Sequence, residues 1–231
     1  MTAGPVLGFD VCAGACSAAI VAESGLLAHE LQPMARGHAE ALMPMIRAVM
    51  QAAGLGFAEL AGLGVTVGPG SFTGVRVGLA AARGLALASG RPLVGVTSFA
   101  AIARAVPQSL RAGRILLLAI DTKRRDLYAE IRAPDDSVLF EGAVRRPEEL
   151  PALLPQGAVL LAGDGASLAA PPLLAAGRAV EAVPVAAPDA ADVAALALER
   201  LRAGGPLPPV RPVYLRAAEA VLPDDGGRLR P

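Results

Sequence analysis

The chain has few of the side chains that usually bind metals or cofactors. Its 231 residues include no tryptophan, two cysteines and two histidines, and aromatic residues make up 3% of the sequence. His29 and His38 lack the i, i+4 spacing that places two imidazoles on one helix face, which argues against a His-based zinc site. Cys12 and Cys16 lie four apart across a predicted turn, where they could bridge or bind a metal; with so few cysteines, we favour reduced thiols without a role. No cofactor and no metal are expected.

The sequence also lacks an excess of charge and any long apolar run. Twenty-one basic residues balance 21 acidic ones, so no global basic field attracts nucleic acid or an anionic membrane. No uncharged apolar stretch approaches the roughly 18 residues of a membrane span, and no cationic stretch precedes the first apolar strand. We therefore expect a cytoplasmic protein with no membrane partner.

Two segments of the chain begin in the same way. Residues 7–10 and residues 118–121 each run an apolar strand into an aspartate, and a turn and further strands follow in both cases. Each half then predicts a three-strand meander followed by helices. The fold class is therefore α/β, with two duplicated lobes that are each a mixed sheet with helices. We place the N-terminal lobe at residues 1–106 and the C-terminal lobe at residues 107–231, the latter ending in an irregular proline-rich tail.

Periodic apolar residues predict the main helices. Residues 38–53 form one apolar stripe that includes Met43, with Pro44 inside it, and residues 73–88 form a second helix that Gly90 ends. In the second half, residues 147–153 and 189–202 are predicted helices, and residues 159–161 are a buried strand.

A glycine-rich turn leads from a buried strand into the second helix. Amide groups at a helix N-terminus can hold an anion, although this segment matches neither the P-loop nor the dinucleotide fingerprint. A purely structural turn is the alternative, and we favour it. The turn consists of Gly68, Pro69, Gly70, Ser71, Phe72 and Thr73.

The helix after this turn carries a row of small residues at Gly74, Gly78 and Ala82. Each helical glycine costs roughly 1 kcal/mol relative to alanine, so something must approach this face closely. Packing within the lobe and contact with a partner's helix are equally open. Arg76, on the first turn, is either a partner or anion contact or an ordinary solvated charge.

Asp10 and Asp121 end the two matching strands and could face a nucleotide or a metal from opposite lobes. Turn capping is the alternative. The turn after Asp10 offers no hydroxyl, lysine or second carboxylate to hold phosphate and Mg²⁺, which favours the structural interpretation. Residues 123–125 form a basic cluster that either touches RNA or a partner or is simply solvated.

Residues 68–84 read Gly-Pro-Gly-Ser-Phe-Thr-Gly-Val-Arg-Val-Gly-Leu-Ala-Ala-Ala-Arg-Gly, which closely resembles the signature of the TsaB (YeaZ) family. The resemblance extends to residues 36–40 before the first helix, residues 92–96, residues 119–121 and residues 212–216. These segments occur in the family's order and spacing over most of the chain.

The resemblance implies an actin-like, Hsp70-like (ASKHA) fold and a role in making threonylcarbamoyladenosine beside the anticodon of tRNAs that read codons starting with A. It implies a non-catalytic subunit that forms a heterodimer with its paralogue TsaD, with TsaE in a ternary complex, and that meets tRNA only through the complex. A homodimer of the isolated chain is possible. No catalytic residue is expected, and Asp10 and Asp121 are remnants of a nucleotide site.

The family's heterodimer forms through helices of the first lobe, which favours a partner surface for the small-residue row. A leucine at Gly78 is then expected to abolish association while leaving the monomer folded. The expected interface residues are His38, Leu42, Met43, Ile46, Met50, Gly74, Arg76, Gly78, Ala81, Ala82 and Leu85.

Two alternatives stay open. The first is an independent actin-fold ATPase or a metallopeptidase-like enzyme. The metal-binding histidines of TsaD correspond to Ser98 and Ile102, which cannot replace imidazole as metal ligands. The second is a stand-alone RNA-binding module, for which residues 123–125 are the evidence.

Overall fold

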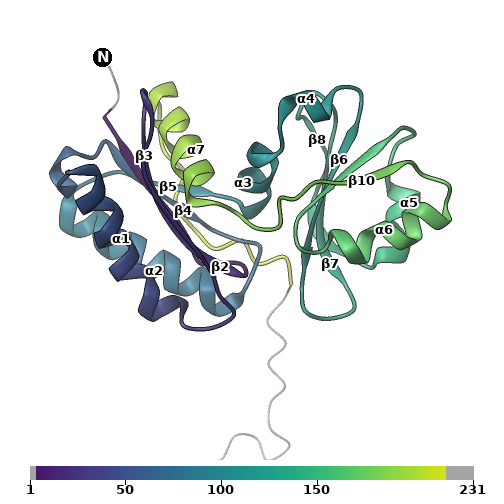
Figure 1. Ribbon diagram of the computed structural model, residues 1–231, viewed down its shortest axis with the longest axis horizontal. Helices are drawn as coiled ribbons and strands as arrows, with labels where there is room; N and C mark the ends of the chain where they lie inside the picture. The colour runs from purple at the N-terminus through teal and green to yellow at the C-terminus, as the bar shows by residue number, and fades with distance from the viewer. Residues whose placement is uncertain (1–3, 217–231) are drawn as a thin grey trace, which may run out of the picture.

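A computed structural model describes residues 4–216 and contains two lobes that lie side by side (Figure 1). The first lobe holds a five-stranded mixed sheet in the order β3-β2-β1-β4-β5. Strands β1 and β2 and strands β2 and β3 are antiparallel, whereas β4 pairs in parallel with both β1 and β5. Its elements are β1 (Val6–Asp10), β2 (Ala15–Ala22), β3 (Gly25–Pro33), α1 (His38–Ala53), η1 (Phe57–Glu59), β4 (Gly62–Thr66), α2 (Phe72–Ser89), β5 (Leu93–Val96) and α3 (Ser98–Ala105).

The second lobe repeats this plan with a sheet in the order β8-β7-β6-β9-β10, so the predicted duplication and fold class are confirmed. The expected helix at residues 147–153 is a 3₁₀ turn followed by one α-helical turn. Helix α6 and strand β10 were missed. The elements of this half of the sequence are α4 (Gln108–Arg111), β6 (Ile115–Asp121), β7 (Leu127–Arg132), β8 (Val138–Arg145), η2 (Pro147–Glu149), α5 (Leu150–Leu153), β9 (Val159–Ala162), α6 (Ala166–Ala175), β10 (Val180–Ala182) and α7 (Ala190–Ala203).

The last helix of each repeat packs against the sheet of the other repeat. Helix α7 covers the inner face of the first sheet, opposite α1 and α2 (Figure 1). In α3, Phe99 and Ile102 pack with Leu116 and Leu118 of β6 on the inner face of the second sheet. The expected assignment of residues 107–231 to the C-terminal lobe is therefore wrong for α7, because packing joins this helix to the first lobe.

Glycines in the first sheet allow α7 to approach closely. A Cβ atom added to Gly8 would lie 2.5 Å from the Ala194 nitrogen, and one added to Gly64 would lie 2.8 Å from the Ala197 Cβ. No real side chain fits such spaces. Small residues on both elements thus set the separation of helix and sheet, and α7 buries Ala190, Val193, Ala194, Ala197 and Leu198.

Helix α1 continues through Pro44 and presents its apolar stripe to the sheet. Leu42, Met45, Ile46, Val49 and Met50 are buried at i, i+3, i+4, i+7 and i+8. Met43 was expected in this stripe, but its side chain is 44% exposed because it points away from the sheet.

The row of small residues on α2 also faces the lobe interior, which corrects the preference for a partner surface. A Cβ on Gly74 would lie 2.0 Å from the Val11 oxygen, and one on Gly78 would lie 3.0 Å from Val11 Cγ2. Ala82 is fully buried. Gly74 therefore meets the backbone of the turn after β1, and Gly78 meets the Val11 and Val65 side chains, so leucine at Gly78 would disrupt the lobe itself.

The tail after α7 returns along the first lobe. Val210 lies beside Gly95 of β5, and the Val213 amide donates a hydrogen bond of 2.8 Å to the Val67 oxygen. Residues 217–231 of the predicted irregular tail lie outside the described residues. No helix within residues 4–216 has the length and apolarity needed to cross a membrane.

We predict opposite effects for Gly→Ala substitutions at two positions of α2. Gly74→Ala forces a methyl group onto the Val11 oxygen and should lower the free energy of unfolding by about 3 kcal/mol. Gly84→Ala meets no atom within 4 Å and should raise it by about 1 kcal/mol, because alanine favours the helix. Urea unfolding of the two variants measures both changes; equal effects would contradict the packing described.

Candidate functional site

Asp10 lies at the carboxyl end of β1 and is completely buried. Its Oδ1 accepts hydrogen bonds from the Thr66 hydroxyl and from the Cys12 amide, the latter at 3.1 Å. The Cys12 thiol donates in turn to Thr66 Oγ1 at 3.2 Å. Oδ2 has no hydrogen-bond partner among the described residues. The hydroxyl that the turn lacks is therefore supplied by the neighbouring strand β4, and it engages Asp10 rather than solvent.

Burial controls the chemistry of this group. It raises the pKa of Asp10 to about 6, although the hydrogen bonds from Thr66 and Cys12 act in the opposite direction. Burial, followed by the charge of Asp10, raises the pKa of Cys12 well above its usual value. Cys12 and Cys16 are both free and buried. Thiols in such surroundings stay protonated and are poor nucleophiles.

The N-terminus of α2 is occupied by the chain's own backbone. Ser71 caps the helix by accepting from the Gly74 amide at 3.2 Å, and its own amide donates to the Cys12 oxygen at 2.8 Å. A Cβ on Gly70 would lie 2.3 Å from that same oxygen. The glycines of the motif turn thus serve close packing on the turn after β1, as expected for the structural alternative, and leave little room for an anion.

The N-terminus of α7 is also capped from within. The Ser17 hydroxyl of β2 accepts from the Ala190 amide at 3.0 Å, and the Asp189 side chain accepts from Ala191 at 2.8 Å. His29 Nε2 lies 2.9 Å from Asp189 Oδ1 and ties edge strand β3 to this cap. The Ala190 and Ala191 amides are therefore satisfied by protein groups.

Asp121, the counterpart of Asp10, belongs to a small ion cluster in the second lobe. The Lys123 ammonium lies 3.1 Å from Asp121 Oδ2 and 2.9 Å from Asp164 Oδ2. The Asp121 amide donates to Asp164 Oδ1 at 2.8 Å. Both carboxylates raise the pKa of Lys123, chiefly through its bond to Asp164. Lys123 therefore links the turn after β6 to the turn after β9, and Asp121 is part of this ion cluster.

Most of the expected interface residues lie inside the lobe. Leu42, Ile46, Met50, Gly74, Gly78 and Ala82 are buried. His38 is half-buried and its Nε2 lies 3.1 Å from the Ala13 oxygen, while Ala81 and Leu85 are also half-buried. Of the eleven residues, Met43 and Arg76 are exposed.

A different set of residues faces solvent on the same two helices. This set, which we call the outer helix face, has one charged member and includes Leu87, whose side chain is 88% exposed. Gly84 also belongs to it and has no neighbour that would conflict with a side chain, so nothing within the lobe explains a glycine there. The outer helix face consists of Met43, Arg47, Ala48, Ala80, Gly84 and Leu87.

An aromatic cluster flanks the start of α2. The ring centroids of Phe72 and Tyr214 lie 5.2 Å apart, and the Arg76 guanidinium carbon lies 3.6 Å from the Phe72 centroid. Arg76 Nε donates to the Tyr214 hydroxyl at 3.1 Å. All three side chains are exposed. Sequence analysis placed Arg76 at a surface but missed Tyr214, which is distant in the chain.

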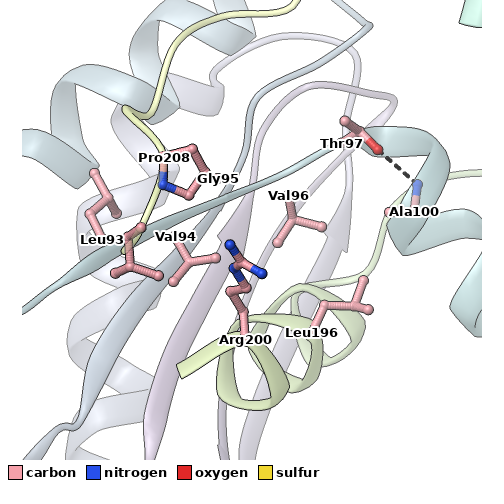
Figure 2. A pocket seen from close by; sticks show the side chains of 10 residues that line it. Leu93, Val94, Gly95, Val96, Thr97, Ala100, Leu196, Arg200 and Pro208 are labelled. Carbon is pink, nitrogen blue, oxygen red and sulfur yellow. Dashed lines mark hydrogen bonds between the residues drawn. The ribbon is translucent and has the colours of Figure 1, made fainter. Parts of the chain in front are cut away.

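A pocket of about 290 Å³ lies beside β5, between α7 and the tail (Figure 2). Its walls are apolar and come from Val94, Val96, Leu196 and Pro208, and Arg200 projects over it. Sequence analysis did not find this pocket, because three separate chain segments form it.

Helix α3 holds the two positions that were compared with the metal-binding histidines of TsaD. Ser98 and Ile102 are both buried in α3. Within residues 4–216, no three His, Cys, Asp or Glu side chains cluster in a way that could hold a metal ion.

Sequence comparisons find relatives concerned with tRNA modification. A family model described as TsaD, tRNA N6-adenosine threonylcarbamoyltransferase, matches residues 30–140. The tRNA threonylcarbamoyladenosine biosynthesis protein TsaB of Escherichia coli (strain K12) is 33% identical over 148 residues, which cover 62% of this chain and 63% of that protein. TsaB of Haemophilus influenzae is 33% identical over 53% of this chain and 51% of its own length. The chain thus spans between half and two thirds of these relatives.

Comparison of structures gives a longer match. YeaZ from Pseudomonas aeruginosa superimposes with a TM-score of 0.74 at 26% sequence identity. The superposition covers 92% of this chain and all of the Pseudomonas chain. The similarity therefore includes both lobes.

We predict that Asp10 makes the fold less stable as the pH rises. The folded protein holds this proton with a pKa of about 6, against 3.8 for the group's ordinary value, so the free energy of unfolding falls between about pH 4 and pH 6. The loss amounts to about 3 kcal/mol. In Asp10→Asn this loss should disappear, as measured by urea unfolding at pH 4 and pH 7.

The pKa of Asp192 is also raised to about 6, mainly by burial, and contributes a loss of the same sign in both proteins. The difference between wild type and Asp10→Asn therefore isolates Asp10. Parallel pH profiles for the two proteins would show that the Asp10 carboxyl titrates normally.

Proposed function

We propose that this chain belongs to the TsaB (YeaZ) family and acts in tRNA threonylcarbamoyladenosine biosynthesis as a non-catalytic partner subunit of a TsaD. TsaD would transfer the threonylcarbamoyl group to N6 of the adenosine next to the anticodon in tRNAs that read codons starting with A. TsaE would join the two proteins in a ternary complex. In this role the chain works in the cytoplasm through a protein surface rather than through an active site.

The outer helix face is the observation that carries this proposal. It combines exposed apolar side chains with small residues, as expected where a second pair of helices packs closely. Gly84 costs the isolated helix about 1 kcal/mol without any compensating contact in the lobe, and a partner's side chain would provide one. We therefore place the interface at the exposed row around Gly84 and not at the buried row around Gly78.

The surroundings of Asp10 and Asp121 support a non-catalytic role. Asp10 is buried under α7, and the carbonyl groups of the turn after β1 pack against α2. Asp121 is bonded to Lys123. Neither aspartate is free to bind Mg²⁺ or phosphate without rearrangement of its neighbours.

An independent ATPase or a metallopeptidase-like enzyme is the alternative function. The duplicated actin-like lobes are the observation in its favour. Calorimetric titration of the purified chain with Mg²⁺-ATP and with Zn²⁺ tests it, and saturable binding of either ligand by the chain alone would favour this alternative.

We predict that Gly84→Leu weakens association with the cognate TsaD by at least about tenfold, a loss of ~1.4 kcal/mol. The side chain would occupy the space that we assign to the partner. Thermal stability of the variant should be equal to or above that of the wild type, because leucine favours the helix. Titration calorimetry with purified TsaD measures the affinity.

Ala175→Leu provides a matched control, since this exposed alanine ends α6 in the other lobe. It should leave the affinity unchanged. Absence of binding by the wild-type chain would refute the proposed function, whereas normal binding by Gly84→Leu would place the interface elsewhere.

A further inference from the structure

Acidic residues are absent from two long segments of this electrically neutral chain. No Asp or Glu occurs between Glu59 and Asp121, and none between Glu199 and Glu219. Both segments carry several arginines. The first segment contains α2 and β5, and the second contains the tail after α7, so the fold brings the acid-free parts of the sequence together.

Four of these arginines lie on the tail or close to it, along one side of the first lobe. Arg83 Nη2 donates to the Val210 oxygen at 2.9 Å, and Arg76 Nε donates to the Tyr214 hydroxyl at 3.1 Å. Arg200 projects over the pocket that the tail helps to form (Figure 2). Arg76, Arg83, Arg200 and Arg211 are exposed, and together we call them the cationic strip.

Within the described part of the chain, no carboxylate pairs with the cationic strip. Two other arginines do form ion pairs: Arg104 Nη1 lies 2.7 Å from Glu199 Oε1, and Arg111 Nη1 lies 2.6 Å from Asp136 Oδ1. Those two line a separate pocket of about 340 Å³ between α3, α4 and α7, where their charge is largely compensated. The positive charge of the cationic strip is therefore available to a ligand.

Aromatic rings lie at one end of the strip. The chain has only seven phenylalanines and tyrosines, yet two of them lie together at the surface. The rings of Phe72 and Tyr214 are tilted by 37° to each other, and the two residues are 49% and 44% exposed. Exposed rings beside unpaired arginines are typical of surfaces that bind RNA, where bases stack on the rings and phosphates contact the guanidinium groups. An acidic protein would use the charges but would not need stacked faces.

The cationic strip and the outer helix face lie on adjacent sides of α2. Phe72, Arg76 and Arg83 follow one flank of α2, because their spacings of four and seven residues return to nearly the same helix angle. This flank faces the tail. Gly84 is turned about 100° from Arg83, onto the neighbouring face that we assign to TsaD, and Leu87, four residues after Arg83, lies at the border between the two.

We propose that the cationic strip and the Phe72–Tyr214 pair form a contact surface for the tRNA substrate, with phosphates on the arginines and an unstacked base on the rings. The proposal rests on the proposed function, which supplies the RNA. It adds contact residues to the expectation that the chain meets tRNA only through the complex, and it differs from an RNA site at residues 123–125.

The test measures binding of a fluorescent, unmodified tRNA that reads codons starting with A to the full chain in complex with TsaD, over a range of salt concentrations. The double variant R200Q/R211Q should reduce the slope of log K against log salt by about 1.5 to 2, and should weaken binding roughly tenfold or more near 0.1 M salt. The matched control R125Q/R146Q removes the same charge from exposed positions in the second lobe. It should change neither quantity.

The aromatic pair has its own readout. Tyr214→Ala should weaken tRNA binding about tenfold without changing the salt slope, because stacking releases no counterions. Tyr214→Phe keeps the ring and should bind normally. Circular dichroism and TsaD affinity verify that each variant is folded and assembled.

Equal effects of the two double variants, or an unchanged salt slope in R200Q/R211Q, would overturn the proposal. Displacement of tRNA by poly-glutamate at equal charge concentration would also overturn it, in favour of an acidic protein ligand. If the chain does not bind TsaD, the proposed function fails, and the same titrations on the chain alone still decide whether the strip binds RNA.

Discussion

The exchange of helices between the two repeats is the constraint on which the structure depends. Helix α7 of the second repeat closes the inner face of the first sheet, and α3 of the first repeat packs on the second sheet. Helix α7 can approach the sheet closely because Gly8 and Gly64, on the strands beneath it, have no side chains. Neither lobe has a complete core without a helix from the other half of the sequence.

This arrangement explains why Asp10 is buried, whereas the outer faces of the first lobe carry exposed residues. Capping of α7 by Ser17 and packing of the turn after β1 against α2 leave Asp10 without access to solvent. Groups that could serve a nucleotide therefore stabilise the turn instead. Gly84, which has no close neighbour, and the four arginines that form no ion pair with a carboxylate of the described residues are exposed on the first lobe.

Local patterns were enough to predict much of the fold, and long-range contacts account for what was missed. The sequence is enough to find the duplicated strand and aspartate, the helix at residues 38–53 and the helix at residues 73–88 that Gly90 ends. Helix α6 was missed because Pro171 and Pro172 lie inside it. The face of α2 was misassigned because Gly74 meets Val11, which is remote in the chain. Thr66 could have been found, since β1 and β4 pair in parallel up to Phe9 and Val65, and Asp10 and Thr66 are the next residues of the two strands.

The position of α7 at the end of the chain has a consequence for synthesis. The first sheet is complete once β5 has left the ribosome, but the helix that covers its inner face follows about a hundred residues later. Until then the apolar strands β1, β4 and β5 have one uncovered side, which is the kind of surface that aggregates or recruits chaperones. The lobe that is translated first is therefore the one that completes its core last.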